Sequence, residues 1–156
     1  MHPYLTPLSL DELRAAKVPE DWTFGVSDRV RFGELDALRH VNNAAYLRWL
    51  EAFRLHYLRD YGISDYTKAD APKIVLKAIG LEFHKEMLLN EDYIVCGKTV
   101  SFGTTSFVMH YAVFSGDLRT TGQAVIVQLN QDGTKRPLSD QVKQTLITRD
   151  GAVARN

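Results

Sequence analysis

The sequence predicts an α+β fold in which an antiparallel sheet of about five strands wraps around one long central helix. One segment, from about Ala44 to Tyr61, has the spacing of an amphipathic helix whose apolar side is unusually bulky. After it, strand-like segments follow one another without an intervening helix. Strands in direct succession favour antiparallel pairing, and such a helix needs a broad apolar partner such as a curved sheet.

The N-terminal part of the sequence is predicted to form an extension followed by the first strand. Residues 1–20 are predicted to be this extension, and residues 21–150 to form the main domain. Within the extension, Ser9-Leu10-Asp11-Glu12 has the capping-box pattern, which predicts a short helix over Leu10–Lys17. Trp22–Arg31 is expected to be the first strand.

The long helix has clear start and stop signals. Asn42 or Asn43 can cap it with a side-chain oxygen, and Gly62 suits its end because glycine tolerates a left-handed conformation. Its apolar arc covers about half of the circumference. The arc consists of a narrow stripe of Tyr46, Leu50, Phe53 and Tyr57, flanked by Trp49, Tyr61, Leu47 and Leu58.

Four later strands are indicated by apolar runs or alternation, and the turns between them by Asn, Asp and Gly. The strands are predicted over Ile74–His84, Tyr93–Phe102, Phe107–Val113 and Thr121–Asn130. The turn signals are Asn90-Glu91-Asp92, Ser115-Gly116-Asp117 and Asp132-Gly133. Pro137–Thr145 is expected to form a short closing helix.

The composition is that of an ordinary globular domain, with 45% hydrophobic and 24% charged residues among 156. Its 19 basic and 19 acidic side chains cancel, so no net charge directs the chain toward nucleic acid or a membrane. Cys96 is the only cysteine, and its place in a strand-like run predicts a packed thiol in a reducing cytosol. Since no signal-peptide pattern or transmembrane-length apolar run is visible, we expect a cytoplasmic protein.

The segment Val30–Arg54 carries the strongest chemical signal. It leads from a strand-like stretch through Asp36 and a His-Val-Asn-Asn turn into the long helix. Asp36 therefore lies just before the positive end of a helix, where unpaired backbone N–H groups suit attack on a carbonyl. From spacing alone, Asp36 fits a surface turn residue or a helix-preceding acid better than a catalytic group.

The order of elements, together with Phe32-Gly33-Glu34-Leu35-Asp36 and His40-Val41-Asn42-Asn43-Ala44-Ala45-Tyr46, resembles the hot-dog fold. More narrowly, residues 22–147 resemble the 4-hydroxybenzoyl-CoA thioesterase family of acyl-CoA hydrolases. The resemblance implies that Asp36 is the catalytic carboxylate and that the N–H groups of Val41 to Asn43 polarise the thioester carbonyl. It also implies an active site at a dimer interface, with dimers often pairing into tetramers.

The chain departs from the family pattern at one position and in one short stretch. Many relatives have glycine where this chain has Arg39. In one branch, basic side chains near the turn between the third and fourth strands bind the nucleotide of CoA, whereas the stretch Phe102-Gly103-Thr104-Thr105-Ser106 contains none. Arg39, Lys85 and the pair Lys135-Arg136 are alternative cations that the sequence does not rank.

The substrate-binding set is predicted to comprise His40, Val41, Asn42, Asn43 and Tyr46. His40 fits a bond to substrate or to its own loop, Asn43 is expected to be the helix cap, and Tyr46 fits a core position better than an acid. Glu34 is expected to be solvated rather than half of a carboxylate dyad with Asp36. Glu51 is expected to pair with Arg48 or Arg54. The histidines show no metal-ligand spacing, so no metal or other cofactor is expected.

The leading functional hypothesis is hydrolysis of an acyl thioester, acyl-CoA or an acyl carrier protein adduct, to free acid and thiol. Asp36 would act as nucleophile or as general base toward water, and both routes stay open. One alternative is a hot-dog hydratase or dehydratase, although the histidine-proline signature of those relatives is missing. Another is a non-catalytic module that binds an acyl ligand. Release of thiol from a panel of acyl-CoAs distinguishes the three.

Overall fold

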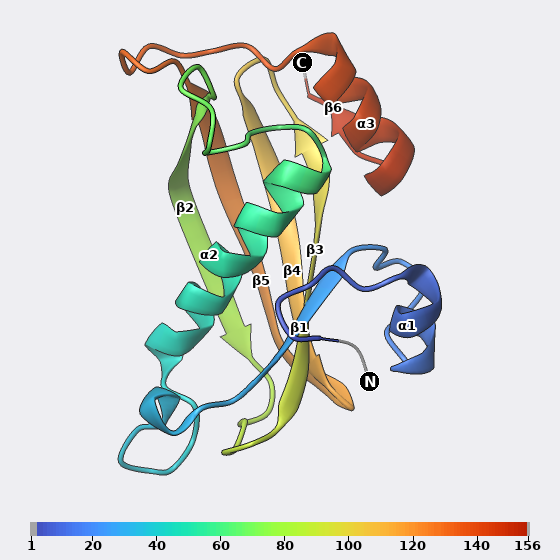
Figure 1. The fold of residues 1–156 in the computed structure, drawn as a ribbon, viewed down its shortest axis with the longest axis vertical. Helices are drawn as coiled ribbons and strands as arrows, with labels where there is room; N and C mark the ends of the chain where they lie inside the picture. The colour runs from blue at the N-terminus through green and yellow to red at the C-terminus, as the bar shows by residue number, and fades with distance from the viewer. Residues whose placement is uncertain (1–2, 156) are drawn as a thin grey trace.

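The computed structural model describes residues 3–155 and lays one long helix across one face of an antiparallel sheet (Figure 1). No helix in this part of the chain is long and apolar enough to span a membrane. In chain order the elements are α1 (Leu10–Ala15), β1 (Gly25–Arg29), a 3-10 turn η1 (Phe32–Glu34), α2 (Asn43–Asp60), β2 (Lys73–Phe83), β3 (Asp92–Phe102), β4 (Ser106–Ser115), β5 (Asp117–Leu129), α3 (Asp140–Asp150) and β6 (Val153–Ala154).

The main strands form an antiparallel sheet in the order β1-β3-β4-β5-β2. This confirms the predicted α+β arrangement of a sheet around a central helix. The short β6, which pairs parallel with β3, was not predicted. The closing helix predicted over Pro137–Thr145 begins later, at Asp140, because the Ser139 hydroxyl caps it by accepting the N–H of Val142 at 3.1 Å.

The apolar stripe of α2 faces the sheet as predicted. Phe53 is 1% exposed and lies directly over β3 at Gly97, where an added Cβ would come within 2.4 Å of the Phe53 ring. Gly97 therefore lets the helix approach the sheet closely. The buried residues of α2 are Ala45, Tyr46, Trp49, Leu50, Phe53, Tyr57 and Leu58.

The cap and stop residues of α2 agree with the sequence prediction, except that a different asparagine is the N-terminal cap. The cap is Asn42, whose Oδ1 accepts the N–H of Ala44 at 2.9 Å, and Asn43 is the first helical residue. The expectation that Asn43 is the cap is therefore wrong, because the backbone leaves the extended conformation one residue earlier. At the other end, Gly62 has a φ of +72° and ends the helix as expected.

The N-terminal segment packs on the opposite face of the sheet. Ile94 and Cys96 alternate along β3 with residues that face α2, so they point to the other side. There they form a second apolar cluster, and burial raises the pKa of the Cys96 thiol to about 12. This confirms Cys96 as a packed thiol. The other members of the cluster are Leu8, Leu13, Val18, Ala112 and Phe114, with Trp22 beside them.

The two outer strands of the sheet differ in how their edges are covered. The N-terminal segment lies along β1, where the N–H of Leu5 donates to Ser27 O and the N–H of Leu8 to Gly25 O, both at 2.9 Å. β2 pairs with β5 on one side only, and no described strand pairs with its other edge. Val75 and Leu76 of β2 are exposed. The β2 edge is thus the open side of the sheet.

Candidate active site

The connection between β1 and α2 folds into a tight loop around Asp36. Leu35 and Val41 pair as an isolated antiparallel bridge, which closes the loop at its base. Inside it, the N–H of Asp36 donates to His40 O at 2.9 Å, and the N–H of Arg39 donates to Asp36 O at 3.0 Å. The loop therefore has a fixed shape directly before the first turn of α2.

Asp36 lies at the surface, and its carboxylate is oriented by its own loop. Its Oδ1 accepts the N–H of Leu38 at 2.9 Å and the N–H of His40 at 3.3 Å. Its Oδ2 has no hydrogen-bond partner within residues 3–155. One oxygen thus holds the side chain in place, and the other is available to a ligand.

Arg39 occupies a backbone conformation that favours glycine. Its φ is +63°, in the left-handed region that costs an ordinary residue about 1–2 kcal/mol. The loop needs this conformation because it turns the chain back from Asp36 to the helix. Glycine would adopt it without steric cost, and Arg39 adopts it in spite of its side chain.

The N–H groups at the helix start are mostly occupied, which corrects part of the predicted site. The N–H of Val41 donates to Met87 O at 2.9 Å, and that of Asn42 to Glu34 O at 2.7 Å. Neither can polarise a substrate carbonyl while these bonds hold. Asn43 N–H has no partner among the described residues, so it is the member of the predicted trio that can act as the donor.

Glu34 is a structural link between the 3-10 turn and the helix. Its Oε2 accepts the Trp49 Nε1–H at 2.6 Å, and its Oε1 accepts the N–H of Arg31 at 2.8 Å. The expectation of a solvated acid is wrong, because the carboxylate is half-buried and both oxygens are occupied. Trp49 in turn stacks on Tyr93 with 4.0 Å between the ring centroids.

Tyr46 lies in the core and His40 in the loop. Tyr46 is 3% exposed and packs against Trp49 and Phe83, with ring centroids 4.9 and 5.0 Å away. Burial raises the pKa of its hydroxyl, and Arg119 and Glu91 are the charges that act on it. The half-buried His40 uses its backbone to bond Asp36, and no described residue bonds its ring.

The predicted ion pair of Glu51 is absent from the described residues. Arg54 instead turns toward the sheet and donates to the Tyr111 hydroxyl at 3.2 Å. Among the candidate cations for a CoA phosphate, Lys85 pairs with Asp117 at 3.0 Å and Arg136 donates to a backbone carbonyl. Arg39 and Lys135 form no ion pair within residues 3–155.

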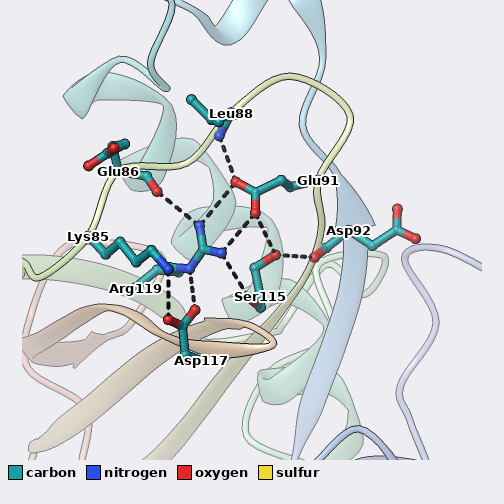
Figure 2. A network of polar contacts seen from close by, with 8 residues as sticks. All are labelled: Lys85, Glu86, Leu88, Glu91, Asp92, Ser115, Asp117 and Arg119. Carbon is teal, nitrogen blue, oxygen red and sulfur yellow. Dashed lines mark hydrogen bonds and ion pairs between the residues drawn. The ribbon is translucent and has the colours of Figure 1, made fainter.

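A second loop, residues 84–91 between β2 and β3, supports the Asp36 segment from both ends. The N–H of Val30 donates to Glu91 O at 2.9 Å, and Val41 donates to Met87 O. This loop is held by Arg119 (Figure 2), a residue that sequence analysis did not single out. Arg119 lies between a predicted turn and the next predicted strand, and nothing in its local sequence marks a buried cation.

Comparisons with known proteins complete the description of the site. A family model described as the thioesterase-like superfamily matches residues 30–146. The chain is 44% identical to a thioesterase superfamily protein from Jannaschia sp. CCS1, with a TM-score of 0.94 over 99% of this chain and 100% of that chain. It is 28% identical to a thioesterase from Thermus thermophilus solved in complex with coenzyme A and Zn, with a TM-score of 0.74 over 85% of this chain and 98% of that chain. It is also 26% identical, over 121 residues, to the uncharacterized protein YsmA of Bacillus subtilis (strain 168), which covers 76% of this chain and 81% of that protein.

Proposed function

The chain belongs to the thioesterase-like superfamily and has the hot-dog fold, and on this premise we propose that it hydrolyses acyl-CoA thioesters to a free acid and coenzyme A. Thioester hydrolysis is the activity that the family description and the names of the similar structures give. The choice of a CoA thioester is supported by the Thermus thermophilus relative, which was solved with coenzyme A.

The observation that carries the proposal is the pairing of Asp36 with the N-terminus of α2. Asp36 presents a carboxylate oxygen without a partner among the described residues, and Asn43 presents a free N–H at the start of an 18-residue helix. The helix dipole adds partial positive charge there, where negative charge would develop on the carbonyl oxygen. This arrangement supplies the two groups that thioester cleavage requires.

In the nucleophilic route, a carboxylate oxygen of Asp36 attacks the thioester carbon while Asn43 N–H stabilises the oxyanion. The C–S bond then breaks, the thiolate takes a proton from a water molecule, and the hydroxide left from that water attacks the acyl carbon of the mixed anhydride, which releases the free acid and the Asp36 carboxylate. In the general-base route, Asp36 removes a proton from water, the resulting hydroxide attacks, and the departing thiolate takes that proton. Both routes use the same two groups and leave Asp36 unchanged after a cycle.

We also propose that the active form pairs two copies through their β2 edges. The open edge offers unpaired backbone groups, and exposed Val75, Leu76 and Leu55 add apolar surface beside it. The contact between Tyr46 of α2 and Phe83 of β2 places the start of α2 next to this edge. A second copy would therefore lie close to Asp36 and help to line the substrate site.

The test is release of free thiol from a panel of acyl-CoAs that differ in chain length and aromatic character. We expect at least one acyl-CoA of the panel to be hydrolysed with saturation kinetics. Hydration of an enoyl-CoA without thiol release would instead support a hydratase, and saturable binding without turnover would support an acyl-binding module. An acyl carrier protein adduct in the same panel tests the choice of CoA.

We further propose a cytoplasmic location, which the buried, reduced Cys96 supports.

A further inference from the structure

Arg119, at the start of β5, is a buried cation whose hydrogen-bonding capacity is fully used. Its side chain is 8% exposed. A guanidinium has five N–H donors, and each of them has an acceptor here (Figure 2). Nε donates to Asp117 at 2.6 Å, Nη1 to Glu86 O at 2.9 Å and to Glu91 Oε2 at 3.0 Å, and Nη2 to Glu91 Oε1 at 2.8 Å and to Ser115 O at 3.0 Å.

These donors are divided between two parts of the chain. Two go to Asp117 and Ser115, which belong to the hairpin that carries Arg119 itself. The other three go to Glu86 and Glu91 of the 84–91 loop. A cation that only closed its own hairpin would need the first group alone. The second group shows that Arg119 fixes the loop.

The loop buries little apolar surface of its own, so its shape depends on polar bonds, of which Arg119 supplies three from its side chain. Within it, only Met87 is fully buried, and Glu91 is half-buried. Arg119 also accepts the N–H of His84 at 2.8 Å through its backbone carbonyl. Glu91 closes the loop on itself, since its Oε2 accepts the N–H of Leu88 at 2.7 Å.

The loop in turn holds the segment that carries the reacting groups. Val30 bonds the loop twice, by donating to Glu91 O at 2.9 Å and by accepting the N–H of Asn90 at 3.1 Å. Val41 bonds it once, at Met87 O, two residues before Asn43. Val30 and Val41 lie on either side of Asp36, so the loop fixes both ends of the segment that contains it.

We propose that Arg119 is a positioning residue for the thioesterase site, which acts through the 84–91 loop on Asp36 and on Asn43 N–H. The inference rests on the proposed function. Lysine in place of Arg119 would keep the charge, but it has three donors on one atom and cannot form a planar fork onto Glu91 while it also holds Glu86 O. The loop would then shift, and misplacing reacting groups by about 1 Å costs roughly 100-fold in rate.

The first test measures thiol release by Arg119→Lys. The matched control is Arg149→Lys, which alters an ion pair with Asp60 at the far end of α2. Arg119→Lys is expected to lower kcat on the order of 10–100-fold, with KM changed by less than about threefold. Arg149→Lys is expected to keep both constants within about twofold of the wild type. A kcat of Arg119→Lys within about twofold of the wild type would overturn the proposal.

The second test does not depend on activity. Amide hydrogen exchange is measured at Val41 and Val30, next to the loop, and at Tyr61, at the far end of α2. In Arg119→Lys, exchange at Val41 and Val30 should accelerate about tenfold or more while Tyr61 stays unchanged. Equal acceleration at all three amides would show general destabilisation and contradict a positioning role.

The two tests separate this inference from the proposed function. If the wild type releases no thiol from any acyl-CoA, the proposed function fails, and the exchange measurement still decides whether Arg119 fixes the Asp36 segment. Should Arg119→Lys not fold, Glu91→Gln replaces it, because the amide can no longer accept two charged hydrogen bonds from Arg119. The same outcomes then apply.

Discussion

At the scale of single residues, two neighbouring asparagines have different tasks. Asn42 contributes its side chain, which caps α2, whereas Asn43 contributes its backbone N–H. Asn42→Ala is therefore expected to lower the free energy of unfolding by about 1 kcal/mol. It should also reduce kcat, because the loss of the cap loosens the turn that carries Asn43 N–H. Asn43→Ala retains the backbone donor and should change stability by less than about 0.5 kcal/mol.

Urea unfolding of both variants, with thiol release as the second readout, checks this difference. A larger loss of stability in Asn43→Ala than in Asn42→Ala would show that the cap has been assigned to the wrong residue. The sequence limited the cap to these two positions, and the expectation of Asn43 was wrong because only the folded backbone shows which of the two identical side chains precedes the first helical residue. The sequence also could not predict that the N–H of Val41 is occupied, because its acceptor, Met87 O, lies far along the chain.

At the scale of elements, the fit of α2 against the sheet determines the core. Phe53 is fully buried against Gly97, and its ring packs edge-on against Tyr111 with 6.1 Å between centroids. Phe53→Ala would leave a cavity beneath the helix and should cost about 3–5 kcal/mol of unfolding free energy. Urea melts provide the measurement. A loss below about 1 kcal/mol would mean that Phe53 does not fill the core as the structure shows.

The loop between β2 and β3 should respond to acid. Although partial burial alone would raise the pKa of Glu91, its bonds from Arg119 and from the N–H of Leu88 hold that pKa below its usual value. The pKa of Asp117 falls to about 2, because Arg119 and Lys85 donate to it. Both folded-state pKa values lie below the unfolded ones, so the stabilisation is present above about pH 4.5 and is lost as pH falls toward about 2.

Thermal unfolding between pH 6 and pH 2 tests this acid response. The wild type should lose Tm across that window, and Glu91→Gln should lose less, because it has no carboxylate at this position to protonate. Parallel curves for the two proteins would show that Glu91 does not contribute through its charge.

The sequence predicted the long periodic helix and the short helix that begins at the Ser9 capping box, but it misplaced or missed the two C-terminal elements. The apolar stripe predicted both ends of α2 to within one residue, because a 3.6-residue periodicity over many turns rarely occurs in segments that are not helical. The closing helix was misplaced, although Ser139 and Gly151 supplied the cap and stop signals that its actual bounds follow. β6 has two residues and carries no periodicity at all. Its place depends on pairing with β3, which only the folded chain reveals.

At the scale of the whole molecule, the β2 edge, with which no described strand pairs, predicts self-association. We expect a dimer or tetramer rather than a monomer of 17.7 kDa in light scattering at micromolar concentration. Leu55 is exposed on α2 and lines a cavity of about 320 Å³ together with Leu76 of β2. Leu55→Glu should therefore weaken the pairing without disturbing the core, and thiol release should fall as the dimer dissociates.

Ile147→Glu is the matched control for the interface, since Ile147 is similarly exposed on α3 and away from β2. It should keep both the assembly and the activity of the wild type. A wild-type protein that scatters as a monomer yet turns over substrate would contradict a site shared between copies.

The catalytic role of Asp36 is tested by kcat for thiol release by Asp36→Asn on the best substrate found. The change keeps the size of the side chain and removes its negative charge and basicity, so kcat should fall on the order of 100- to 10,000-fold while circular dichroism stays unchanged. The matched control is Asp132→Asn, because Asp132 Oδ1 likewise accepts a loop N–H, that of Thr134 at 2.9 Å, and lies outside the α2 connection. We expect the control to keep wild-type activity. Near-wild-type kcat in folded Asp36→Asn would show that another group cleaves the thioester, and would remove Asp36 from the mechanism.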